Sequence, residues 1–126
     1  MDKNKSLTIK EIFSRAVKNH QEGKTDIALK LYNQVLKIDP NYADAHNNLG
    51  VIFQNQMNHE KAKDCYEKAI AINPNYAHAH NNLGLIFKIL GENQKAKECY
   101  EKAIVIKPDY AHAHNNLGLI FKILGE

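Results

Sequence analysis

Seven histidines and two cysteines are the side chains of this 126-residue chain that could hold a metal ion or attack a substrate. Four of the histidines form two pairs, His78 with His80 and His112 with His114. On a helix, residues two apart point to different faces, whereas helical zinc ligands are typically four apart. The spacing therefore predicts neither a metal site nor a bound cofactor.

The two cysteines are predicted to be free thiols. Cys65 and Cys99 stand 34 residues apart in similar helical stretches, EKAKDCYEKA and QKAKECYEKA. Stacked helices lie about 10 Å apart, farther than the roughly 7 Å between Cα atoms that a disulfide tolerates. A catalytic cysteine needs a base beside it in a cleft, and no Walker, GxGxxG, GxSxG or CxxC motif is present. The sequence thus predicts no catalytic residues and a protein that is not an enzyme.

Composition narrows the class of partner and the location. The net charge is +3 and charged residues make up 25%, a balance too mild to predict nucleic-acid binding. No apolar stretch is long enough to cross a membrane, and the N-terminus lacks the apolar core of a secretory signal. A cytoplasmic protein that binds neither nucleic acid nor membrane is expected.

A 34-residue repeat sets the spacing of the histidines and cysteines and of the helices that carry them. Residues 110–126 repeat residues 76–92 without a change. After a lead-in over residues 1–8, we expect units at 9–42 (diverged), 43–76 and 77–110, and the first helix of a truncated unit at 111–126. The predicted fold is all-α, an α-solenoid of stacked antiparallel helix pairs with about seven helices.

Each unit reads as two helices separated by a break. In the third unit, apolar residues recur at helical spacing up to Gly91. Glycine commonly ends a helix, so the first helix is expected to stop there. Pro108 stops the second helix, because proline lacks an amide hydrogen. Thr8 with Glu11 predicts a capping box at the start of the first unit. Gly50, Gly84 and Gly118 predict places where helices approach closely.

The pattern resembles the tetratricopeptide repeat (TPR) family over residues 9–126. The residues that carry it are Leu83, Gly84, Phe87, Gly91, Ala96, Tyr100, Ala103 and Pro108, with their counterparts one repeat away. The resemblance implies three and a half TPR units in a right-handed superhelix, whose first helices line a concave groove for partner peptides. Where the family often has tryptophan, this chain has His46, His80 and His114, which we expect to fill a partly buried packing site.

Groove residues are predicted from the stripe formed by positions four, three and four apart along each first helix. The stripes and their flanks give this set: Asp44, Asn47, Asn48, Val51, Asn55, His78, Asn81, Asn82, Leu85, Lys88, Ile89, His112, Asn115, Asn116, Leu119 and Lys122.

Within this set, Asn48, Asn82 and Asn116 form a ladder with one asparagine per repeat. An asparagine amide both donates and accepts, so a ladder suits an extended peptide backbone. The run AHNNLG, which contains the ladder asparagine of each unit, is similar to repeats of O-linked N-acetylglucosamine transferase, although nothing here resembles the catalytic domain of that enzyme. Lys88, Lys122, His78 and His112 favour acidic ligands.

In co-chaperone TPR domains, groove residues grip the C-terminal carboxylate of heat-shock chaperones. At the matching positions this chain has Phe13, Val17, Asn48, His78 and Asn82, and only Asn48 agrees with that pattern. A clamp for chaperone tails is therefore not expected.

Four interpretations of the repeats compete. The first is a non-catalytic scaffold that binds an extended peptide. The second is a substrate-presenting arm of a larger glycosyl- or sulfotransferase-type enzyme. The third is a self-assembly module. The final helix carries Leu117, Ile120, Phe121 and Leu124 with no second helix to cover them, so a homo-oligomer could form there. In the fourth, the asparagines are solvated surface residues copied by duplication.

Overall fold

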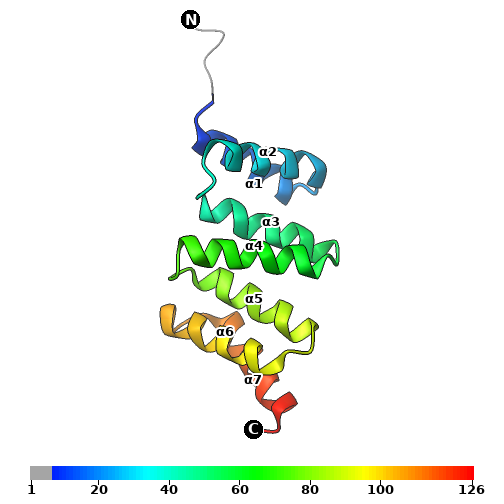
Figure 1. Cartoon of the computed structure of the whole chain (residues 1–126), viewed down its shortest axis with the longest axis vertical. Coiled ribbons are helices and arrows are strands. Elements are labelled where there is room, and N and C mark those ends of the chain that lie inside the picture. Colours follow the sequence, from blue (N-terminus) through cyan, green and yellow to red (C-terminus); the bar gives the residue numbers. More distant parts are fainter. Residues whose placement is uncertain (1–6) are drawn as a thin grey trace, which may run out of the picture.

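Seven α-helices stacked along one long axis make up the computed structural model, which describes residues 7–126 (Figure 1). The helices are α1 (Ile9–Gln21), α2 (Thr25–Ile38), α3 (Ala43–Asn55), α4 (His59–Ile72), α5 (Ala77–Ile89), α6 (Asn93–Ile106) and α7 (Ala111–Leu124). The described residues contain no strand, which confirms the predicted all-α solenoid. Of the expected lead-in, residues 1–6 lie outside the described part.

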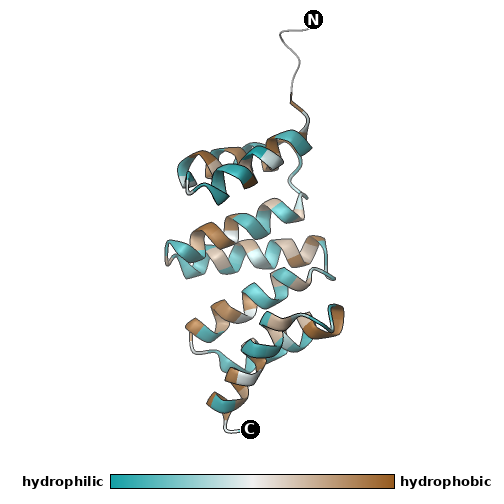
Figure 2. Ribbon diagram, turned by 180° about the vertical axis from the view of Figure 1, so that it is seen from behind, coloured by the Kyte–Doolittle hydropathy of each residue, from teal (hydrophilic) through white to brown (hydrophobic). Residues whose placement is uncertain are grey.

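Packing is between neighbours in the chain. Each helix packs against the one before and the one after it, and α5 also contacts α3 and α7. The largest fully buried side chains recur one repeat apart, with Tyr32, Tyr66 and Tyr100 in the second helices of the pairs. Figure 2 accordingly shows apolar segments on every helix rather than one central cluster. The core is repeated along the stack, and its stability comes from adjacent units.

Two glycines allow the tyrosine rings to approach the preceding helix. A Cβ atom added to Gly50 would lie 2.5 Å from Cε1 of Tyr66, and one added to Gly84 would lie 2.6 Å from Cε1 of Tyr100. The predicted close approach is confirmed at both positions. For Gly118 the prediction is wrong, since no heavy atom lies within 4 Å of its added Cβ. No helix follows α7 in the described chain to supply the corresponding tyrosine.

The helix ends follow local rules. The predicted capping box is confirmed, because the backbone N–H of Glu11 donates to Thr8 Oγ1 and that of Thr8 to Glu11 Oε1, both at 3.1 Å. Four residues spaced one repeat apart adopt left-handed backbone conformations after first helices, with φ between 61° and 80°: Gly23, Met57, Gly91 and Gly125. Met57 is the one non-glycine with positive φ among the described residues.

A histidine in each first helix after α1 reaches back to the preceding turn. Nε2 of each lies 2.7–2.9 Å from the carbonyl oxygen of a proline six residues earlier; the pairs are His46–Pro40, His80–Pro74 and His114–Pro108. Because a carbonyl only accepts, Nε2 must carry the proton. Of the three, only His80 is buried, and burial lowers the pKa of His80. These histidines tie each turn to its following helix.

Candidate peptide-binding face

One side of α5 stays accessible while most of the rest of the helix is buried. On α5, His78, Asn82, Leu85 and Ile89 are exposed or partly exposed, whereas Leu83 and other residues between them are buried. We define the ladder face as the accessible stripes of α3, α5 and α7: Asp44, Asn48, Val51, Asn55; His78, Asn82, Leu85, Ile89; His112, Asn116, Leu119, Ile123. Each of these residues is at least partly exposed.

Hydrogen bonds between units hold the asparagines of this face in line. Nδ2 of Asn82 donates to Oδ1 of Asn47 at 3.2 Å, and Nδ2 of Asn116 donates to Oδ1 of Asn81 at 3.0 Å. Both acceptors are buried. The structure therefore places Asn47 and Asn81, two predicted groove residues, behind the face, where each joins its helix to the next first helix.

The first ladder asparagine, Asn48, has a different hydrogen-bond partner, because the first unit has no asparagine at the corresponding position. Its residue at the repeat position of Asn47 is Phe13, which has no amide and packs against Tyr32 and Tyr42, with ring centroids 5.9 and 5.0 Å away. Asn48 instead donates from Nδ2 to the hydroxyl oxygen of Tyr32 at 3.3 Å. Every asparagine of the ladder is thus anchored to the preceding unit through its amide nitrogen.

The anchored amides keep hydrogen-bonding capacity. An asparagine amide has two N–H donors and a carbonyl acceptor. For Asn82 and Asn116, the bond to the preceding unit uses one donor, and the carbonyl oxygen makes no hydrogen bond within residues 7–126. Since both side chains are partly exposed, each can still donate to and accept from a backbone laid across the helices.

Tyrosines from the turns fix the first row of the face. The hydroxyl of Tyr76 donates to the Asp44 carboxylate, and burial followed by that carboxylate raises the pKa of Tyr76. The hydroxyl of Tyr110 lies 2.7 Å from Nδ1 of His78, and the two rings meet edge to face at 4.9 Å. His112, at the same repeat position as His78, is exposed, and its ring lies edge to face with that of Tyr110, with centroids 6.1 Å apart.

The flank of the face differs between units at one position. Gln54 accepts a hydrogen bond from the hydroxyl of Tyr66 at 2.7 Å. The next unit has partly exposed Lys88 there, and the buried hydroxyl of Tyr100 finds no partner in the described chain. Burial raises the pKa of Tyr100 to about 12. Lys122 and Asn115, on α7, are exposed. Sequence comparison of positions 54 and 88 could have shown this difference.

Replacing Lys88 with glutamine should therefore stabilise the protein by about 1 kcal/mol, because a buried hydroxyl without a partner gains an acceptor. Urea unfolding measures the change. The same substitution in a Tyr100→Phe background, which lacks the hydroxyl, should give no gain. An equal gain in both backgrounds would show that the hydrogen bond is not the cause.

The two cysteines lie on α4 and α6, outside the ladder face. Cys65 and Cys99 are free and partly buried, and burial raises the pKa of Cys99 to about 12, so its thiol stays protonated at neutral pH. Among residues 7–126, no three His, Cys, Asp or Glu side chains are grouped to hold a metal ion. None of the described helices has the length and apolar character needed to cross a membrane.

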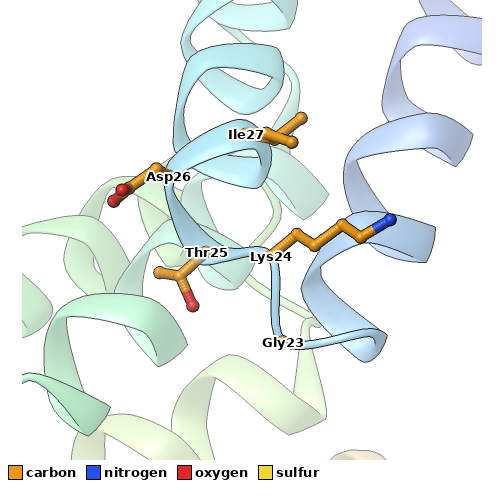
Figure 3. A pocket seen from close by; sticks show the side chains of 5 residues that line it. All are labelled: Gly23, Lys24, Thr25, Asp26 and Ile27. Carbon is orange, nitrogen blue, oxygen red and sulfur yellow. The ribbon is translucent and has the colours of Figure 1, made fainter.

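A cavity of about 370 Å³ at the α1–α2 turn is lined by Gly23, Lys24, Thr25, Asp26 and Ile27. Figure 3 shows the Lys24 and Asp26 side chains pointing to opposite sides. None of its residues belongs to the ladder face, and its charged groups do not converge on a common point.

The stacked helix pairs and the ladder face define a helical-repeat protein with an α-solenoid fold. Models described as tetratricopeptide repeat match residues 43–76 and 65–98, and one described as TPR repeat matches residues 19–56 and 84–125. The chain belongs to the tetratricopeptide repeat family. No curated protein sequence gives a significant match.

Solved structures agree on the fold. The first TPR of Spaghetti (RPAP3) bound to the HSP90 peptide SRMEEVD is 23% identical, with 97% of each chain covered and a TM-score of 0.88. The crystal structure of MamA is 30% identical over 94% of this chain and 69% of that chain, with a TM-score of 0.85. Pseudomonas aeruginosa pilF is 28% identical over 93% of this chain and 54% of that chain, with a TM-score of 0.84.

Proposed function

We propose that this protein is a non-catalytic scaffold that binds an extended peptide segment of a partner protein on the ladder face. The observation that carries the proposal is the row of partly exposed amides, Asn48, Asn82 and Asn116, each anchored to the preceding unit. In this family the first helices line the concave groove. One structure with the same fold holds a peptide of HSP90, and this supports the same use here.

The spacing of the amides fits an extended backbone. Packed helices lie about 10 Å apart and an extended chain rises about 3.3 Å per residue. One ladder asparagine therefore meets roughly every third peptide residue. Contacts to backbone groups leave the ligand's side chains free, which favours broad specificity.

The charge of the face favours acidic peptides. Lys88 and Lys122 lie at its edge, and α5 and α7 contain no aspartate or glutamate. In α3 the Asp44 carboxylate already accepts a hydrogen bond from Tyr76. An acidic ligand thus meets cations over α5 and α7 without a facing carboxylate on those helices.

A peptide array followed by titration of its best binder tests the proposal. Asn82→Ala/Asn116→Ala should weaken binding about tenfold or more, because each lost hydrogen bond contributes about 1 kcal/mol. Asn81→Ala is the matched control, since it removes a buried acceptor and leaves the accessible amides. It should lower stability with a smaller change in affinity. Unchanged binding by the double variant in a folded protein would contradict the proposal.

The alternative is that a second copy of this chain, rather than a peptide, binds at α7. Leu117 and Phe121 on α7 are partly exposed, whereas their counterparts on α5, Leu83 and Phe87, are buried. Sedimentation of the titrated samples distinguishes peptide binding from self-association, because a mass that rises with concentration, without peptide binding, favours self-association.

An arm that presents substrates to an enzyme would bind those substrates on the ladder face in the same way. Two free thiols suit the reducing cytoplasm as its location.

A further inference from the structure

The ladder face changes character along the stack. In the row that ends each stripe, α3 has Asn55, whereas α5 and α7 have Ile89 and Ile123. Ile89 and Ile123 are 47% and 52% exposed, and Leu119 is 47% exposed. We define the apolar strip as Leu85 and Ile89 on α5 with Leu119 and Ile123 on α7. Contact of such large apolar side chains with water is unfavourable, and burying them against an apolar group of a ligand would be favourable.

The strip runs beside the amide ladder. Leu85 and Leu119 each follow a ladder asparagine by three residues, about one helical turn, and so lie next to it on the same side of the helix. Because α5 contacts α7, the strip is shared by two units. A peptide held by Asn82 and Asn116 would direct every second side chain to one side, towards the strip.

The charged residues within α5 and α7, the two helices that carry the strip, have one sign. Lys88 precedes Ile89 and Lys122 precedes Ile123, and no carboxylate occurs in α5 or α7. Glu92 and Glu126 follow those helices, and in each case the side chain pairs with a lysine of α6, Lys95 at 3.4 Å and Lys97 at 3.1 Å. The strip therefore combines an apolar surface with two lysines at its edge that form no ion pair within residues 7–126.

From these observations we propose that Ile89 and Ile123 determine specificity: the third and fourth units select an acidic peptide in which apolar side chains alternate with acidic ones. The proposal rests on the peptide-binding function above and names the ligand class that the ladder alone would not distinguish. Over α3, where Asn55 replaces isoleucine, backbone contacts dominate and the same preference is absent.

Two labelled peptides of roughly nine residues, the length that spans three first helices, test the proposal. Both alternate glutamate with a second residue, which is leucine in one and serine in the other. Fluorescence anisotropy compares them on the wild type and on Ile89→Asn/Ile123→Asn, which copies the residue that α3 has naturally. Val105→Asn is the matched control, because Val105 is 78% exposed on α6 and outside the ladder face.

The wild type and Val105→Asn should bind the leucine peptide at least about tenfold more tightly than the serine peptide. The double variant should bind both within about threefold of each other. If the wild type binds both peptides equally, or if the double variant still discriminates between them, the proposed role of the apolar strip in specificity is wrong. Peptide binding by the ladder asparagines is not contradicted by either result. If neither peptide binds, the proposed function itself fails. If the double variant instead turns a dimer into a monomer, the strip is a contact between copies.

Discussion

Gly84→Ala is expected to destabilise the protein, whereas Gly118→Ala is expected to stabilise it, although both glycines lie in identical sequence. At Gly84 the new Cβ would meet the Tyr100 ring at 2.6 Å, while at Gly118 nothing lies within 4 Å. Overpacking costs about 1–3 kcal/mol. Alanine gains about 1 kcal/mol over glycine inside a helix. The clash therefore dominates at Gly84, and helix propensity dominates at Gly118.

Thermal and urea unfolding of the two variants measure the difference. A Tyr100→Ala background supplies the control, because removing the ring removes the clash, and Gly84→Ala should then become stabilising. Two variants that shift the midpoint in the same direction would contradict the assigned packing of Tyr100 against α5.

Met57→Gly should stabilise the protein by about 1 kcal/mol. Met57 has φ 61°, at the repeat position where Gly23 and Gly91 have φ 77° and 80°. A left-handed conformation costs a residue with a Cβ roughly 1–2 kcal/mol. The gain on relieving it is partly offset, because glycine loses more freedom on folding. The exposed Met57 side chain gives up little packing.

The reverse exchange, Gly91→Met, should cost a similar amount, and unfolding midpoints measure both changes. Gln56→Gly is the matched control, because Gln56 precedes Met57 but has an ordinary φ of −87°. It should destabilise slightly through chain entropy. If Gln56→Gly and Met57→Gly had the same effect, strain at Met57 would not be the cause.

The repeat made the fold predictable. A period of 34 residues and apolar positions at helical spacing indicated seven helices, and the capping box at Thr8 followed from a local rule. The close approach at Gly50 and Gly84 could also be predicted, because a mid-helix glycine needs a close neighbour to justify its cost. That the neighbour is a tyrosine ring was not predicted. Gly118 departed from the rule because its environment depends on what packs against α7, which its own sequence does not state.

The candidate site was less predictable. The accessible stripe followed from helical periodicity, but the roles of adjacent asparagines did not. Asn81 and Asn82 differ by one position, yet one is buried and the other partly exposed. That division depends on how closely first helices of different units approach, a distance that no single helix encodes. The bonds from Tyr76 to Asp44 and from Tyr110 to His78 link residues 32 apart and needed the stack itself.

The hydrogen bonds from Asn82 to Asn47 and from Asn116 to Asn81 give the stack a mechanical property. These bonds cross between units beside the surface that we propose meets the ligand. Tension along the solenoid would lengthen them and move the amides out of register with a strand bound as proposed. A ligand spanning both asparagines would resist this stretching, so affinity and extension would be coupled, and the bound partner would stiffen the molecule against load.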